Sequence, residues 1–148
     1  MISTLTAPTR PHHQLIAAWL RLWNGEPDLA ETIISPQFRL HAALLGGADE
    51  DSIDDAGALT GWITSTRAAV KDLTFTLEVG PLTDTDHVAL RWRATGHYSG
   101  GFPGATAAPG TPVDFTGTDM LRIEDGRIAE YWVNSDMHVL LGQLGVRS

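Results

Sequence analysis

The chain has 148 residues, a formal net charge of −8 and no cysteine. The lack of cysteine excludes disulfides and thiol nucleophiles, and the acidic balance disfavours a surface that follows nucleic-acid phosphates. No apolar run reaches the roughly 20 residues of a membrane helix, and no signal peptide is recognisable, so we expect a cytoplasmic protein without a membrane or nucleic-acid partner. The length fits one domain, expected over 11–148 after a flexible tail at 1–10.

The first half of the chain is predicted to be mainly helical. Apolar residues recur at helical spacing over 11–25 and again over 58–70, which predicts two amphipathic helices. A shorter helix is expected between the prolines that bound 27–36. The apolar stretch at 38–45 predicts a first strand, and the acidic residues after it predict a loop.

The second half changes to the two-residue period of β-strands. Strands are predicted at 73–79, 87–98, 113–123 and 127–134, with turns at 81–86 and at Asp125-Gly126, a loop rich in Gly, Ala and Pro at 99–112, and a short final helix at 137–144. Helices gathered on one side of a mostly antiparallel sheet define an α+β fold. We expect the long sheet to curve into a cone whose concave face is covered by the N-terminal helices and encloses a pocket.

The sequence from His87 to Gly145 resembles the SnoaL-like polyketide cyclase family, whose members have the cone fold of nuclear-transport-factor-two-like proteins. The residues that carry the resemblance are the strand Val88 to Trp92, the glycines from Gly96 to Gly104, Asp119, the segment Arg122 to Ile128, and Gln143-Leu144-Gly145. The resemblance extends over 12–145 and is sharpest from about 86 onward. It implies the fold strongly and the reaction weakly, because this fold hosts cyclases, isomerases, epoxide hydrolases, dehydratases and binding proteins.

Asp119 is the first candidate for chemistry. It lies in the middle of an apolar strand, and alternation places it on one face with Gly117 and Leu121. If that face is the concave one, burial raises the pKa of the carboxyl and suits it to general acid or base catalysis. The alternative is a structural Asp that is satisfied by a neighbouring Arg, Trp or backbone group.

The resemblance also implies a difference from the characterised cyclases. Those enzymes carry a histidine at the position of Asp119 and a catalytic Asp on the next strand, where this chain has Val133. Related epoxide hydrolases place an acid at the latter position as well. Two alternatives follow. Either Asp119 has taken over the acid/base role of the missing Asp, or the protein has lost its catalytic activity.

Two residues of the preceding strand could assist Asp119. Tyr98 shares a face with Trp92, and its phenol could donate a hydrogen bond to a substrate carbonyl or enolate. His97 points to the opposite face unless the backbone twists at Gly96. Packing at the end of a strand is the alternative role for Tyr98.

A further set of residues is expected to bind substrate. The resemblance places His41 at the mouth of the pocket, although a lone His beside apolar residues is also typical of a core. Strand phase and helix position suggest cavity-lining roles for Trp62, Trp92, Tyr131 and Val133, with ordinary core packing as the alternative. Asn134 and Asp136 lie at the end of the last strand, where a turn and a helix N-cap explain them equally well. No ligand spacing for a metal and no phosphate-binding loop is present, so we expect no cofactor.

Three interpretations follow. The first is a cofactor-free enzyme for a small hydrophobic carbonyl compound, most typically an aldol cyclase and otherwise an isomerase or dehydratase. The second is a non-catalytic protein that binds a small hydrophobic ligand, including polycyclic aromatic ones. The third is a dimerisation module with a vestigial cavity, since folds of this kind pair through their open sheet faces and a homodimer is expected.

Overall fold

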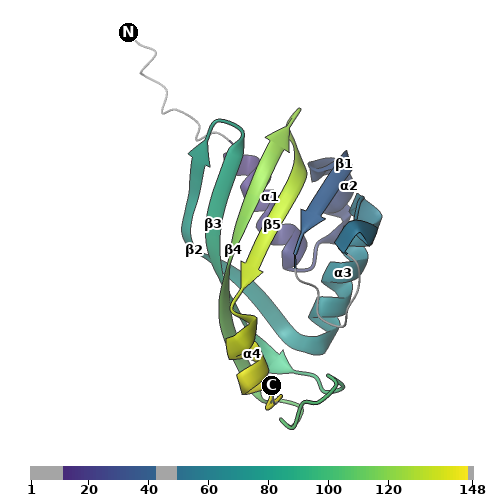
Figure 1. Ribbon diagram of the computed structural model, residues 1–148, viewed down its shortest axis with the longest axis vertical. Coiled ribbons are helices and arrows are strands. Elements are labelled where there is room, and N and C mark those ends of the chain that lie inside the picture. The colour runs from purple at the N-terminus through teal and green to yellow at the C-terminus, as the bar shows by residue number, and fades with distance from the viewer. Residues whose placement is uncertain (1–11, 43–49, 147–148) are drawn as a thin grey trace.

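Helices from the first half of the chain cover one face of a five-stranded sheet (Figure 1). The computed structural model describes residues 12–42 and 50–146. The helices are α1 (His13–Trp23), α2 (Ala30–Ile33), α3 (Ala56–Ala69) and the C-terminal α4 (Met137–Gln143), with short 3-10 turns at Pro27–Leu29 and Glu50–Ser52. No helix in these two described segments is long and apolar enough to cross a membrane.

The sheet confirms the predicted α+β class. Its strands are β1 (Ile34–His41), β2 (Val70–Asp84), β3 (His87–Tyr98), β4 (Pro112–Glu124) and β5 (Arg127–Ser135). They lie in the order β1-β5-β4-β3-β2. The pairs from β2 to β5 are antiparallel, whereas β1 runs parallel to β5. The curved sheet and α1 to α3 therefore form two layers, with the core between them.

Two predicted boundaries were wrong, and proline explains both. Pro36 lies inside β1 instead of ending a helix, and Pro81 lies inside β2 instead of opening a turn. Both strands are at the edges of the sheet, and each proline lies where the pairing with the neighbouring strand shifts its register, so that its missing N–H is tolerated. The pairing of β2 with β3 shifts its register between Val79 and Leu82, the segment that contains Pro81. Gly80 lies in the same segment with a φ of 99°, a value that glycine adopts readily. The predicted tail at 1–10 and the predicted strand end at 43–45 lie outside the described residues.

Aromatic rings fill the space between the helices and the concave face of the sheet. Trp19 and Trp23 come from α1, and Trp62 comes from α3. They meet rings of the sheet in edge-to-face contacts, such as Trp19 with Tyr131 at 4.7 Å and Trp23 with Phe75 at 5.4 Å between centroids. Nearly all these rings are buried, so the centre of the cone is a packed aromatic cluster.

The C-terminal helix holds the Gly/Ala/Pro loop that follows β3. The carbonyl of Leu144 accepts hydrogen bonds from the backbone N–H groups of Thr106 and Ala107, each at 3.0 Å. The Gln143 amide pairs with both backbone groups of Asp114 at 2.7 and 2.9 Å, beyond the point where β4 still pairs with β5. These contacts give the loop a defined position at the narrow end of the molecule (Figure 1).

Candidate active site

Asp119 of β4 is the buried charged residue at the centre of the cone, with an exposed fraction of 2%. Its Oδ2 accepts a hydrogen bond from Trp19 Nε1 at 3.0 Å. Its Oδ1 accepts one from Trp92 Nε1 at 2.8 Å and a longer one from the Tyr131 hydroxyl at 3.3 Å. Three neutral donors from α1, β3 and β5 thus converge on one carboxylate.

The register of the sheet explains how Trp92 reaches this carboxylate. Trp92 on β3 lies directly opposite Gly117 on β4. A Cβ atom at position 117 would overlap the Trp92 ring, so the absence of a side chain there lets the indole lie across β4. From this position the ring directs its N–H to Asp119, two residues further along the same face.

Burial dominates the electrostatics of the site. Loss of hydration raises the pKa of Asp119 from 3.8 to about 6, and the bonds from Trp19, Trp92 and Tyr131 oppose that rise. Burial and the Asp119 charge raise the pKa of Tyr131 well above its usual value, so Tyr131 remains a protonated donor. At neutral pH the site therefore holds a carboxylate with increased proton affinity, and Oδ2, which has a single donor, is the oxygen better able to take up a proton.

Replacing Tyr131 with Phe tests this balance. Tyr131→Phe removes a hydrogen bond that stabilises the charged form, so we expect the pKa of Asp119 to rise above about 6. The measurement is a pH titration of the Asp119 carboxyl carbon by NMR. Tyr98→Phe is the matched control, because its hydroxyl bonds to Phe102 and leaves Asp119 untouched. An unchanged midpoint in Tyr131→Phe would show that its long hydrogen bond does not act on the charge.

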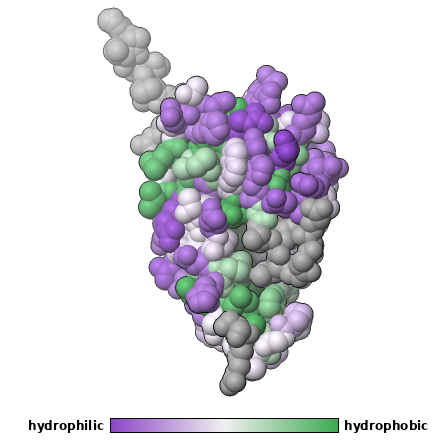
Figure 2. Space-filling view, in the orientation of Figure 1, coloured by the Kyte–Doolittle hydropathy of each residue, from purple (hydrophilic) through white to green (hydrophobic). Residues whose placement is uncertain are grey.

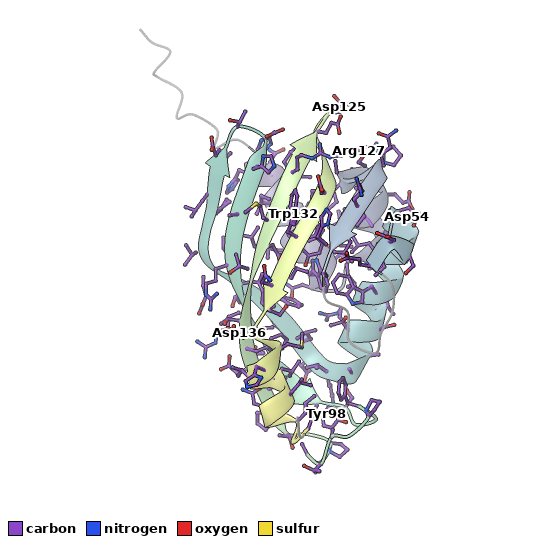
Figure 3. The ribbon with its side chains drawn as sticks, viewed as in Figure 1. Asp54, Tyr98, Asp125, Arg127, Trp132 and Asp136 are labelled. Carbon is purple, nitrogen blue, oxygen red and sulfur yellow. The ribbon has the colours of Figure 1, made fainter. Side chains whose placement is uncertain are left out.

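Tyr98 is buried on the same face of β3 as Trp92, as its strand phase predicted, but it lies far from Asp119. It is eight residues along β3 from Leu90, the residue opposite Asp119, which corresponds to about 26 Å. Its hydroxyl accepts a hydrogen bond from the backbone N–H of Phe102 at 2.7 Å, and the side chain lies by the loop at the narrow end (Figure 3). The structure does not bring Tyr98 and Asp119 into one site.

The two candidate histidines lie on the outer face of the sheet. His97 is exposed, as its strand phase indicated, and its Nδ1 lies 3.8 Å from Asp72 Oδ2. His41 stacks on Trp132 with ring centroids 5.1 Å apart and contacts Glu130 at 2.6 Å. The expectation that His41 lies at the pocket mouth was wrong, because β1 pairs with β5 in a register that places its ring beside Trp132 on the outer face.

The other residues that were predicted to bind substrate divide between the inner and the outer side of the sheet. Trp62, Trp92 and Tyr131 belong to the aromatic cluster, and Val133 lies opposite Asp119 in the pairing of β4 with β5. Asn134 is exposed on the outer face. Asp136 occupies the N-cap position of α4, but its side chain makes no capping bond and instead contacts Thr116 and Arg91. Asn134 and Asp136 are therefore directed away from Asp119.

Sequence reasoning missed the two tryptophans of α1 as site residues. Trp19 and Trp23 are four residues apart and lie on one face of the helix. Their spacing showed that both face the core, but a neutral indole donor for Asp119 follows only from the three-dimensional pairing of α1 with β4. Among the residues described, no group of three or more His, Asp or Glu side chains could hold a metal ion.

The SnoaL-like polyketide cyclase family model matches residues 13–144 of the chain. The match spans most of the sequence, including α1 and every strand of the cone. The chain belongs to the SnoaL-like polyketide cyclase family. No curated protein matches the chain.

Several solved structures share the fold. IdmH from Streptomyces antibioticus, described as a candidate polyketide cyclase, is 31% identical, with 92% of this chain and 99% of that chain covered and a TM-score of 0.77. TsrD from Streptomyces laurentii is 23% identical over 90% of this chain and 94% of its own, with a TM-score of 0.73. AclR from Streptomyces galilaeus, described as a candidate hydroxylase, is 24% identical over 89% and 79%, with a TM-score of 0.71. For TsrD and AclR the likeness concerns the fold alone.

Proposed function

We propose that this protein is a cofactor-free acid/base enzyme that acts on a small hydrophobic carbonyl compound, with Asp119 as the group that moves the proton. The observation that carries the proposal is a carboxylate buried among neutral donors and aromatic rings, with a pKa of about 6. A base whose pKa lies near the working pH is both ionised and able to hold a proton. The apolar surroundings suit a ligand that is itself largely apolar.

An aldol cyclisation is the reaction that fits the family best. Asp119 Oδ2 removes a proton from a carbon next to a carbonyl group, and the resulting enolate carbon attacks a second carbonyl carbon of the same molecule. The new carbon–carbon bond closes a ring, the second carbonyl oxygen becomes an alkoxide, and this oxygen takes the proton back from Asp119. Return of the proton to a different carbon would give an isomerisation. A dehydration would follow ring closure if Asp119 removed a second proton from the carbon between the carbonyl and the new hydroxyl-bearing carbon and the hydroxyl left as hydroxide, so that one water is lost and a carbon–carbon double bond forms.

Entry of a ligand requires the aromatic cluster to open. Trp62 is half-buried, whereas Trp19, Trp23, Trp92 and Tyr131 have exposed fractions of 7% or less. Trp62 also contacts Trp23 at 5.2 Å and Tyr131 at 6.4 Å between ring centroids. Displacement of the Trp62 ring would thus expose the inner rings while α1 and the sheet stay in place.

A non-catalytic binding protein is the second candidate. Val133 is apolar and lies opposite Asp119, so the cone has no second acid at this place. Under this interpretation the three donors hold a structural carboxylate, and the aromatic rings alone select the ligand.

The two candidates are separated with 2-tetralone, a bicyclic aromatic ketone with an acidic C1–H bond. Binding is measured by calorimetry, and proton transfer by the exchange of the C1 hydrogens in D₂O, followed by NMR. We expect saturable binding and exchange faster than in buffer. Binding without accelerated exchange would favour the non-catalytic protein, and no binding would contradict both candidates for this class of ligand.

We also propose that the outer face of the sheet pairs with a second copy of the chain. The register aligns one row of residues across all five strands, namely Leu82, Ala89, Met120, Trp132 and His41. Met120 and Leu82 in this row are 45% and 62% exposed. Figure 2 looks onto this face and shows apolar residues near the β2 edge among polar ones. Large apolar side chains exposed in one row are typical of an interface.

Met120→Glu tests the dimer. Met120 lies on the central strand, so a two-fold axis near it would bring two introduced carboxylates together without partners. We expect light scattering to give twice the chain mass of 16.0 kDa for the parent protein and 16.0 kDa for the variant. Val139→Glu is the matched control, because Val139 is 49% exposed and lies on α4, outside the row. A parent protein of 16.0 kDa at micromolar concentration would contradict the proposal.

A further inference from the structure

One buried donor at the centre of the cone has no partner. Trp23 has an exposed fraction of 7%, and its Nε1 finds no hydrogen-bond acceptor within the described part of the chain. No other buried side-chain nitrogen or oxygen in that part is left unpaired. Because buried polar groups are almost always hydrogen-bonded, an unpaired indole N–H in a tightly packed cluster needs an explanation.

The surrounding backbone holds Trp23 in place. Arg67 Nη1 donates to the Trp23 carbonyl at 2.9 Å and to the Leu73 carbonyl at 2.7 Å, which ties the end of α1 to α3 and to β2. The side chain of Asn24 pairs with both backbone groups of Phe75 at 2.7 and 3.0 Å. Three of these hydrogen bonds hold Trp23 and Asn24 at the end of α1, and the fourth ties α3 to β2. The backbone that carries the indole is therefore held, and the N–H changes its direction only by rotation of the Trp23 side chain.

The unpaired N–H belongs to the same cluster of rings as Asp119. Trp19, which donates to Asp119 Oδ2, precedes Trp23 by one helical turn, and their ring centroids are 6.1 Å apart. Tyr131, another donor to Asp119, lies 6.4 Å from Trp23 by the same measure. One indole of α1 thus donates to the carboxylate, and the N–H of the second, in the same cluster of rings, has no acceptor among the described residues.

We propose that Trp23 Nε1 is the hydrogen-bond donor for a carbonyl oxygen of the ligand. The inference rests on the proposed function, because it assumes that a carbonyl compound enters the cone. A neutral donor on the carbonyl oxygen would stabilise the negative charge that develops there when Asp119 removes a proton from the adjacent carbon. It would also select an oxygen-bearing ligand over a hydrocarbon of the same shape, since only the former satisfies the buried N–H.

Contact of the N–H with a ring face is the competing explanation. Trp62 and Phe75 meet Trp23 edge to face, at 5.2 and 5.4 Å between centroids. An N–H directed at a ring is a weak hydrogen bond, and a carbonyl oxygen would replace it with a stronger one. If Trp23 Nε1 donates to a ligand carbonyl, loss of the N–H weakens the binding of a ketone more than the binding of a hydrocarbon of the same shape. If it contacts only a ring face, loss of the N–H affects the binding of both ligands alike.

The test compares 2-tetralone with tetralin, which has the same ring system without the oxygen. Trp23→Phe removes the N–H and keeps an aromatic ring, and Trp132→Phe on the outer face is the matched control. We expect Trp23→Phe to weaken 2-tetralone binding about five- to tenfold more than it weakens tetralin binding, in line with the loss of one hydrogen bond. Trp132→Phe should leave both affinities within about twofold.

A second measurement uses the unmodified protein, in case Trp23→Phe does not fold. The five indole N–H groups of the chain are observed in a ¹H–¹⁵N spectrum, and the Trp23 signal is assigned through its own backbone by triple-resonance experiments. Trp23 Nε1 is the buried indole nitrogen without an acceptor in the described part of the chain. We expect 2-tetralone to shift this signal downfield as the N–H becomes hydrogen-bonded, and tetralin to produce no such shift.

The outcomes separate this proposal from the one on which it rests. Equal loss of affinity for 2-tetralone and tetralin in Trp23→Phe, or no downfield shift in the unmodified protein with bound 2-tetralone, would overturn the role of Trp23 and leave the proposed function standing. Failure of the unmodified protein to bind either probe would overturn the proposed function and this inference together.

Discussion

Asp119→Asn is expected to lower the exchange rate of 2-tetralone by about 10²- to 10⁴-fold, the usual contribution of a positioned acid or base. The amide has nearly the shape of the carboxylate, but it cannot take up a proton from carbon. Its NH₂ group would also face the indole of Trp19 if it replaced Oδ2, or the donors of Trp92 and Tyr131 if it replaced Oδ1, so at least one of the three present hydrogen bonds is lost. We expect the loss of activity to exceed any loss of binding.

Asp114→Asn is the matched control for this substitution. Asp114 lies on the same strand with its side chain on the outer face, where it pairs with Arg93 at 2.6 Å. We expect the exchange rate of this variant to stay within about twofold of the parent, since exposed ion pairs contribute little. Comparable activity in Asp119→Asn and in the parent would remove Asp119 from the mechanism.

Asp119→Asn is also expected to change how the free energy of unfolding depends on pH. The native pKa of Asp119, about 6, is above its ordinary value of 3.8, so the native state holds the proton more tightly than the unfolded state does. This contribution to stability is complete below pH 3.8 and is lost as the pH rises through about 6, by about 3 kcal/mol in all. Urea unfolding from pH 4 to pH 7 should therefore show the parent losing stability relative to Asp119→Asn. A constant difference between the two proteins would contradict the raised pKa.

Gly117→Ala is expected to disrupt the site without touching a polar atom. The new methyl group would overlap the Trp92 ring and displace it from β4. Overpacking of this kind lowers the free energy of unfolding by about 1–3 kcal/mol. Displacement of Trp92 also removes its hydrogen bond to Asp119, so the pKa of that carboxyl should rise. The measurements are urea unfolding and the NMR titration of the carboxyl carbon.

Gly61→Ala is the control for Gly117→Ala. Gly61 lies in α3, and a Cβ atom there meets nothing within 4 Å. Alanine is the better helix former by about 1 kcal/mol, so this variant should be as stable as the parent or more stable. If both glycine variants behaved alike, close packing of Trp92 on Gly117 could not be what positions the indole.

Much of the fold was predictable because its signals are local. The boundaries of β3 and the turn at Asp125-Gly126 match the predictions, since a two-residue period and an Asp-Gly pair specify them directly. The same rules were wrong at Pro36 and Pro81. A proline's effect depends on whether its strand is at the edge of the sheet, and strand order is not a local property.

The candidate site was predicted in part for the same reason. Alternation grouped Asp119 with Gly117 and Leu121 on one face of its strand and Tyr98 with Trp92 on one face of the preceding strand, and the structure shows Asp119 and Tyr98 buried on the concave side of the sheet. The distance between them could not be read from alternation, which gives the face of a residue and not its height on the sheet. The role of Trp19 depends on how α1 crosses β4, a contact between residues that are 100 positions apart.

The pH dependence of 2-tetralone exchange, measured in parallel for the parent and Asp119→Asn, is the most direct test of Asp119 as the catalytic base. We expect the parent rate to rise with pH through a midpoint near 6 and to level off above it, since the ionised carboxylate is the active form. Asp119→Asn should show only the buffer rate at every pH. A parent profile without this midpoint, or the same profile in Asp119→Asn, would contradict the assignment of acid/base chemistry to Asp119.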